Sequence, residues 1–449
     1  MIKMKQPNGG GHGPKSRGMQ GIRRQASRTI AAVIVLAFSA HAANAEESLA
    51  NWLGNAKLLA DARLRYEGVD DASKTVRANA LTARARIGVQ TASWNGLAAL
   101  IEVDGVWNIN NDFNSTRNGR TNYPVVADPQ MLALNRLQLS YASPFHTTLV
   151  FGRQRILLAN QRFIGNVGWR QHEQTYDAVT LANTSLPGLT ATFSYVVRVN
   201  RVFGTSAPVP AAGPAAALRC DCHLFDLNYA GIPGLKLGAF AYFLDLSQRS
   251  GPPTARLATS KLSTTTVGAR ASFSFALSQD LSATFSGVAA HQSNYRNNPL
   301  SIDLRYWQGE TGFTYAGLTG DLGYEVMQGN GTIGFSTPLA TLHAFDGWAD
   351  LFLTTPANGV DDFYVKGAYA IPLAAHVLHI DRVTATLVHH DFSTDIARAG
   401  IGTEWDGSLE FGYDHFELLL KYADYRGSGV GRGGFADKSI NWVQMAYKY

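Results

Sequence analysis

The chain of 449 residues lacks any apolar run long enough to cross a membrane as a helix. Such a helix needs about 20 mostly apolar residues, and the longest run here, Ile30 to Phe38, is much shorter. Charge is also scarce: Asp, Glu, Lys and Arg make up 16% of the chain, against about 25% in a typical soluble domain. We therefore expect no helical membrane anchor, and the composition does not fit an ordinary soluble domain.

Cysteine is almost absent, with only Cys220 and Cys222 in the segment CDC. Two thiols alone make a poor metal site, so a disulfide at a loop tip is the main alternative to free thiols. The sequence also lacks a nucleophile elbow, a cluster of metal ligands and a phosphate-binding loop. We therefore expect no enzyme activity, no cofactor and no metal, and the state of the two cysteines stays open.

The amino-terminal segment predicts export. Arg23, Arg24 and Arg28 precede the apolar run, and Ala43-Asn44-Ala45 follows it with the small residues that a signal peptidase needs. We expect residues 1–45 to be a cleaved signal peptide, with Met19 as a second candidate start, and residues 46–449 to be the mature domain.

Cleavage changes the charge of the protein. Residues 1–45 hold seven Lys and Arg and no acid, so the 39 basic residues fall to 32 against 34 Asp and Glu. The mature chain then has a net charge of −2 rather than +5, and binding to nucleic acid is not expected.

The last twelve residues, Lys438 to Tyr449, predict a strand with one apolar face. Val443, Met445, Tyr447 and Tyr449 recur at every second position, with polar residues among those between them. A carboxy-terminal aromatic residue closing such a strand resembles the signal by which bacterial outer-membrane barrels are assembled. An edge strand of a soluble β protein is the alternative interpretation.

Short turns recur along the chain, each between two segments of alternating polarity. Eight of them are predicted, at Trp94-Asn95-Gly96, Pro144-Phe145-His146, Pro187-Gly188, Pro233-Gly234, Gln279-Asp280, Gly317 to Gly320, Ile371 to Ala375 and Tyr413-Asp414-His415. Eight turns join sixteen strands, and a strand at each chain end makes eighteen. The predicted fold is all-β: a transmembrane antiparallel barrel with short periplasmic turns and long extracellular loops.

The connections between hairpins differ in character. Asn110 to Gln130 is long and polar and predicts an exposed loop, and Arg201 to Arg219 is rich in Ala, Pro and Gly and predicts a mobile one. Leu157 to Gln174 and Gly329 to Val360 keep large apolar side chains that must be buried, and we expect both to fold into the barrel mouth.

Two segments resemble a known family. Phe151 to Val179, FGRQRILLANQRFIGNVGWRQHEQTYDAV, and Phe335 to Val365, FSTPLATLHAFDGWADLFLTTPANGVDDFYV, are similar to signature segments of the alginate export porins. The resemblance implies an eighteen-stranded monomeric barrel whose arginine-rich, partly occluded lumen passes anionic polysaccharide.

Arginines at alternating positions predict a basic arc on the inner face of the first five strands. An arginine that faces lipid near the bilayer midplane costs about 2 to 4 kcal/mol, so these residues are expected to face the lumen, where guanidinium groups suit carboxylates. The members are Arg63, Arg65, Arg84, Arg86, Arg136, Arg153 and Arg155, with Glu102 and Asp104 on the same face. The alternative is that they only neutralise lumen acids, for which Glu102, Asp104, Glu310, Glu325, Glu404, Asp406, Glu410 and Glu417 are the candidates.

The segment Pro338 to Asp350 is predicted to constrict the lumen. Its candidate residues are Thr341, His343, Phe345, Asp346, Trp348 and Asp350. The histidine and the two aspartates match no strong metal-ligand spacing.

Together these features predict a monomeric channel in the outer membrane of a Gram-negative cell, surrounded by lipid and inserted by the barrel assembly machinery. We expect it to pass solutes passively, and polysaccharide such as alginate is the solute that the resemblance implies. Two alternatives stay open: a general small-solute porin without anion preference, and a sealed structural or adhesive barrel.

Overall fold

The computed structural model describes residues 51–204, 214–246, 253–371, 380–428 and 435–449, so the predicted signal peptide lies outside the described residues. The chain divides into two units, residues 1–55 and 56–449. Of the first unit only residues 51–55 are described, as a single helical turn. The rest of this section concerns the second unit.

Eighteen strands make up this unit. Their bounds are β1 (Lys57–Asp71), β2 (Ala78–Gln90), β3 (Leu97–Asn108), β4 (Met131–Ser143), β5 (Thr147–Gln154), β6 (Thr175–Asn183), β7 (Leu189–Asn200), β8 (Ala217–Ile232), β9 (Leu235–Leu244), β10 (Thr264–Ala276), β11 (Leu281–Asn294), β12 (Asp303–Tyr315), β13 (Leu318–Met327), β14 (Val360–Ile371), β15 (Arg382–Ser393), β16 (Gly400–Tyr413), β17 (Phe416–Gly427) and β18 (Lys438–Lys448). A short helix α3 (Pro253–Ser260) and a 3-10 turn η1 (Leu342–Ala344) interrupt the loops.

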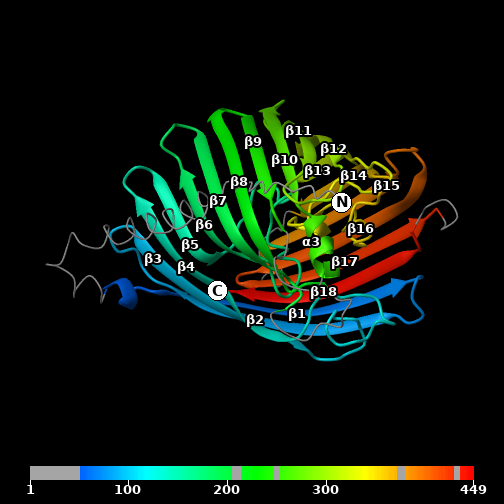
Figure 1. Ribbon diagram of the computed structural model, residues 1–449, viewed down its shortest axis with the longest axis horizontal. Coiled ribbons are helices and arrows are strands. Elements are labelled where there is room, and N and C mark those ends of the chain that lie inside the picture. Colours follow the sequence, from blue (N-terminus) through cyan, green and yellow to red (C-terminus); the bar gives the residue numbers. More distant parts are fainter. Residues whose placement is uncertain (1–50, 205–213, 247–252, 372–379, 429–434) are drawn as a thin grey trace, which may run out of the picture. The chain divides into compact units, whose positions relative to one another are not determined.

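Each strand pairs with its neighbours in sequence, and β1 pairs with β18, so the sheet closes into a barrel (Figure 1). All pairings are antiparallel, and the predicted fold class and strand count are confirmed. The closing seam runs from Asp61 opposite Lys448 to Asp71 opposite Lys438. Closure of the predicted barrel requires the last strand to pair with the first, for which the sequence predicts Lys57 to Glu67; the observed partner segment lies four residues further along β1.

The strands alternate between an apolar outer face and a polar inner face. On β3, for example, Ile101 and Val103 are exposed, whereas Glu102 and Asp104 are buried. This arrangement is the reverse of that in a soluble protein, and it suits a barrel wall whose outer face contacts lipid. Closure of the barrel also leaves no backbone group unpaired in such a setting.

Among the described residues, no helix has the length and apolar character needed to cross a membrane.

The turns fall where the sequence predicts them, with one shift. The predicted turn Gly317 to Gly320 is wrong in its bounds, because only Ala316 and Gly317 separate β12 from β13. Both have positive φ, 46° and 84°, as in the two-residue primed turns whose twist matches a hairpin. Most of the predicted turn Ile371 to Ala375 lies outside the described residues.

Two long loops fold inward, as predicted. We call them the 155–174 loop, between β5 and β6, and the 328–359 loop, between β13 and β14. They bury large apolar side chains inside the barrel, among them Ile164, Phe335 and Leu339.

The prediction of an exposed loop at Asn110 to Gln130 is wrong in part. Phe113, Val126 and Asp128 are buried, and Asp128 accepts a hydrogen bond from the backbone N–H of Gln171 at 2.8 Å. The loop is polar in composition, but its few apolar residues pack inside the barrel. The centre of the Arg201 to Arg219 segment lies outside the described residues, and its end belongs to β8.

Cys220 and Cys222 form a disulfide with a Cα–Cα distance of 5.3 Å. It lies on the inner face of β8 rather than at a loop tip. Here Val197 of β7 faces two residues of β8, because the register shifts between Val196 and Arg198. Such a bulge gives β8 an extra residue beside the disulfide.

The seam depends on the last residues of the chain, which predicts the result of a truncation. The Tyr447 ring packs on Phe416 with ring centroids 5.0 Å apart, and the Tyr449 N–H donates to the carbonyl of Ala60 at 2.8 Å. Deleting Tyr447 to Tyr449 is expected to abolish assembly, since an unclosed edge leaves backbone groups unpaired in lipid. The measurement is the amount of heat-modifiable barrel, which migrates differently on a gel before boiling, in isolated outer membranes. Tyr447→Phe, which keeps the ring, serves as the control, and folded barrels from the truncated chain would contradict the prediction.

Candidate functional site

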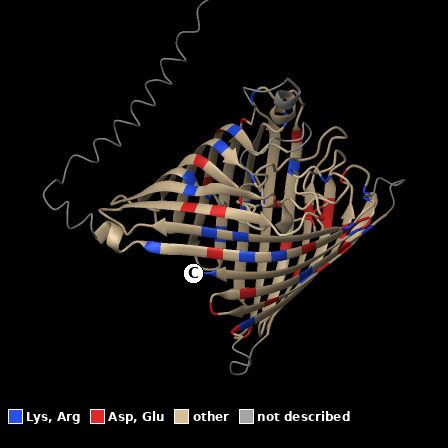
Figure 2. Cartoon of the chain, turned by 90° about the horizontal axis from the view of Figure 1, so that it is seen from below, with Lys and Arg blue, Asp and Glu red and all other residues tan. Residues whose placement is uncertain are grey.

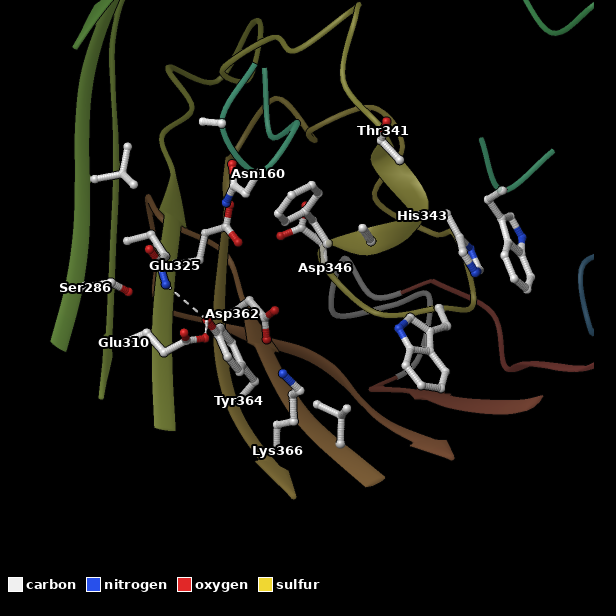
Figure 3. Close-up of a pocket in the computed structure, with 18 of the residues that line it drawn as sticks. Asn160, Ser286, Glu310, Glu325, Thr341, His343, Asp346, Asp362, Tyr364 and Lys366 are labelled. Carbon is white, nitrogen blue, oxygen red and sulfur yellow. Dashed lines mark hydrogen bonds between the residues drawn. The ribbon is translucent and has the colours of Figure 1, made fainter. Parts of the chain in front are cut away.

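A chamber of about 1100 Å³ lies inside the barrel and is bounded by wall strands and by the two inward loops. Figure 3 shows part of its lining, with side chains of β11 to β14 facing those of the 328–359 loop. The chamber reaches Lys236 and Glu417, which lie beside the short turns. The chamber is also lined by Arg63, Asn160, Trp169, Arg270, Ser286, Gln308, Glu310, Glu325, Thr341, His343, Phe345, Asp346, Trp348, Asp362, Tyr364, Lys366, His390 and Lys421.

The two loops are joined to each other. The Gly165 N–H donates to the carbonyl of Leu339 at 2.9 Å, and the Thr341 N–H donates to the carbonyl of Gln161 at 3.0 Å. The Thr341 hydroxyl also accepts the Val167 N–H at 3.0 Å. A displacement of either loop would break these bonds, so the pair forms one structural unit across the lumen.

The seven predicted arginines lie on the inside of the barrel, in one arc, but most are engaged with carboxylates. Arg84 pairs with Asp61, Arg136 with Glu102 at 2.6 Å, Arg153 with Asp177 at 2.7 Å, Arg155 with Glu173 at 2.7 Å, and Arg86 with Asp104 and Glu173, both at 3.5 Å. Figure 2 shows basic and acidic positions interspersed along the strands of the wall.

Arg155 was expected on the fifth strand, but β5 ends at Gln154, so Arg155 is the first residue of the loop.

The remaining two arginines of the arc hold the 155–174 loop by neutral groups. One Arg63 nitrogen donates to the backbone carbonyls of Gly168, Trp169 and Arg170 at 3.0 to 3.3 Å. Arg65 donates to the Gln444 side chain at 2.6 Å and lies 4.0 Å above the Trp169 ring. The arc is therefore the surface to which this loop is fastened.

Sequence reasoning missed the loop charges that complete these pairs. Arg170 contacts Glu67 and Asp350 at 3.2 Å and Asp128 at 3.7 Å. Arg162 contacts Glu325 at 2.5 Å and Asp346 at 2.7 Å. The polar cluster WRQHEQ, Trp169 to Gln174, is the signal that points to Arg170, whereas Arg162 lies outside this cluster.

Glu173 remains ionised among these ion pairs between the wall and the 155–174 loop. Burial raises its pKa, but Arg86 and the hydrogen bonds from Arg155 and Asn135 outweigh burial and lower the pKa from 4.5 to about 2. A carboxylate with a lowered pKa stabilises the folded state fully above its ordinary pKa, and that stabilisation is lost as the pH falls toward 2. The loop is therefore held by this residue at any pH a cell meets.

A cage of aromatic rings surrounds Lys421 of β17. Its ammonium nitrogen lies 3.6 Å from the ring centroid of Trp348, 4.4 Å from that of Trp169 and 5.4 Å from that of Trp442. His343 stacks on Trp169 with a centroid distance of 4.3 Å. Two wall strands and both loops thus meet at one cation, an arrangement worth about 2 kcal/mol when desolvated.

His343 is neutral within this cage. Burial, then Lys421, lower its pKa from 6.5 to about 3. Its Nδ1–H donates to Asp350 at 2.8 Å, and its Nε2 accepts a hydrogen bond from Lys421 at 2.8 Å.

The six candidate residues of the constricting segment divide into two groups. Thr341, His343, Phe345, Asp346 and Trp348 line the chamber, whereas Asp350 is buried behind it against Arg170 and His343. Asp346 turns instead to Arg162, so the histidine and the two aspartates do not converge. No group of three His, Cys, Asp or Glu side chains within the described ranges is placed to hold a metal ion.

Comparisons with known proteins show the fold. No family model matches the sequence, and no curated protein matches it. Solved structures do match: OccAB2 and OccAB4 of Acinetobacter baumannii, each with a TM-score of 0.66, at 13% and 15% identity, and OpdK of Pseudomonas aeruginosa with vanillate, with a TM-score of 0.64 at 14% identity. Each alignment covers 89% of this chain and 99% of the other. A further matching structure of OpdK describes it as an outer-membrane protein.

The Arg162 pairs predict the effect of a single substitution. Arg162→Met leaves the buried carboxylates of Glu325 and Asp346 without their counter-ion, and breaking a buried pair in this way costs about 3 to 5 kcal/mol. We expect the 328–359 loop to leave its position more often, which would appear as frequent steps of raised current in single-channel recordings. Arg426→Gln, which removes an exposed arginine, is the matched control. Steady currents in Arg162→Met, equal to those of the control, would show that this pair does not hold the loop.

Proposed function

We propose that the protein is an outer-membrane channel through which small polar solutes pass passively. The observation that carries this proposal is the chamber inside a closed barrel, with a charged inner face and an apolar outer face. Barrels of sixteen to eighteen strands are wide enough to leave an aqueous passage, whereas those of about eight are filled by side chains. The chamber also argues against the sealed structural or adhesive barrel, and catalysis is not part of the proposal.

The size of the solute follows from the two loops. Because the two loops are joined to each other across the lumen and fastened to both sides of the wall, their ordered backbone narrows the passage beside the chamber. This favours small solutes over a polymer. OpdK, whose barrel is similar, has been solved with vanillate, a small molecule, which supports the same size class here.

Anionic polysaccharide such as alginate, the solute implied by the resemblance, is the second candidate. Arg63 and Lys236 line the chamber and favour an anion, whereas Arg270, which also lines it, pairs with Asp226 at 2.6 Å. Against this, five of the seven arginines of the arc are paired with carboxylates, so the alternative that they balance charge has the stronger support. Location in a Gram-negative outer membrane, assembly by the barrel machinery and a monomeric state belong to the same proposal.

Liposome swelling tests the proposal and separates the candidates. Purified protein in liposomes is presented with neutral sugars, amino acids and uronate oligomers of similar mass. Swelling with the small solutes supports the proposal, and faster swelling with uronate oligomers would favour the polysaccharide candidate. Absence of swelling with every solute would indicate a sealed barrel.

The constricting segment predicts a gain of conductance on deletion. Replacing Thr341 to Ala349 by a short Gly-Ser linker removes six of the residues that line the chamber, and with them the ring of Trp348 from the Lys421 cage. We expect the single-channel conductance in planar bilayers to rise about twofold or more, because conductance follows the open cross-section of the lumen. A same-length linker in place of residues 116–122, in the loop between β3 and β4, is the control. Unchanged conductance after the first replacement would reject the constriction.

A further inference from the structure

We propose that the chamber wall formed by β12, β13 and β14 is a recognition site for an ammonium group, so that the channel favours amine-bearing solutes over anions. This inference rests on the proposed channel function and names the class of solute. It concerns the side of the lumen away from the arginine arc.

The wall presents a positioned carboxylate. The Tyr364 hydroxyl on β14 donates to Glu310 on β12 at 2.7 Å and accepts from the Gln308 amide at 3.1 Å. To reach them its ring crosses β13 at Gly323, where a Cβ atom would overlap the ring. Three strands are therefore shaped to hold Glu310, which is half-buried and has no Lys, Arg or His ion pair among the residues that the structure describes.

An unsatisfied acceptor faces this wall from the opposite loop. The Asp346 carboxylate is 4% exposed, and one of its oxygens binds Arg162 while the other has no hydrogen-bond partner. In Figure 3 Asp346 points from the 328–359 loop toward the side chains of β12 to β14. A buried acceptor without a donor is costly, and a solute that supplies N–H groups would satisfy it.

The charges around this wall leave a surplus of acid. Glu310, Glu325, Asp346 and Asp362 all line the chamber. The basic groups that face them are already engaged: Arg162 with two of these acids, Lys366 with Asp321 at 3.1 Å, and His390 with Asp362 at 2.9 Å. On β16, Glu404 and Asp406 add two buried carboxylates with no Lys or Arg ion pair in the described part of the chain; they accept the N–H groups of Ala349 and Trp348, and Asp406 lies 3.6 Å from His390.

An ammonium group suits this arrangement better than a metal ion or an anion. It carries three N–H donors and a full charge, and it is larger than a bare metal ion. The described carboxylates form no group of three that could hold a metal. At this wall an anion would meet Glu310, which has no counter-ion among the described residues, whereas the basic lining residues Arg63, Lys236 and Arg270 lie on other strands, β1, β9 and β10. The site therefore favours a primary amine, with Glu310 and Asp346 as its acceptors.

Reversal potentials with matched organic ions test the inference. Planar bilayers holding the full-length mature protein are bathed in n-propylammonium chloride, and then in potassium propionate of the same concentration. We expect propylammonium to be more permeant than propionate. In Glu310→Gln and in Asp346→Asn the permeability ratio should fall at least about twofold, because each change removes one of the charges that concentrate cations in the cleft.

Glu417→Gln is the matched control, because Glu417 also lines the chamber but lies on β17, outside the site. Heat-modifiability checks that every variant is folded. A fall as large in Glu417→Gln as in Glu310→Gln, or a wild-type preference for propionate, would overturn the ammonium site while leaving the channel proposal intact. Absence of any conductance in the wild type would overturn both.

Discussion

The structure depends on one constraint: every strand must find its backbone partners within the sheet, because a bilayer, in which we propose the barrel lies, offers none. The chain meets this constraint by closing eighteen strands through the β1–β18 pairing, so every strand has a neighbour on both sides. Once the wall is closed, alternation leaves half of the side chains on the inside, and in the proposed membrane setting charged residues have no other place. The polar interior is therefore a consequence of closure.

The loops inside such a barrel need fixed positions, and ion pairs and hydrogen bonds between the wall and the loops provide them. The 155–174 loop is held by the arginine arc, and the 328–359 loop by carboxylates of the opposite strands: Asp406 and Glu404 accept the N–H groups of Trp348 and Ala349 at 3.1 and 2.7 Å. Replacing water around these groups with fixed partners is favourable only if all are satisfied. The chamber is the part of the lumen that the two loops do not fill. Its free charges are those of side chains that take no part in the ion pairs between wall and loops.

The sequence predicts the wall well and the interior poorly, for a physical reason. A two-residue period and Pro-Gly turns are local signals, so eighteen strands and most turn positions can be read directly. The turn at Ala316–Gly317 is shifted because a primed turn needs only two residues, and Gly320 is simply part of β13. The pairs that shape the interior join distant residues: Arg63 and the carbonyl of Trp169 lie 106 positions apart. No local pattern predicts which carboxylate each arginine meets, and the resemblance to alginate export porins directs attention to the arginines rather than to Glu310 and Tyr364.

The central claim is that solutes and ions cross the barrel through the chamber beneath the two loops. Ser286 of β11 lines that chamber, and its neighbour Phe285 is exposed on the outer face. Because Cys220 and Cys222 are joined, a cysteine placed at Ser286 is free for a thiol reagent. The account predicts that a bulky methanethiosulfonate lowers single-channel current through Ser286→Cys and leaves Phe285→Cys unchanged. Full current through Ser286→Cys after complete labelling, verified by mass, would contradict it.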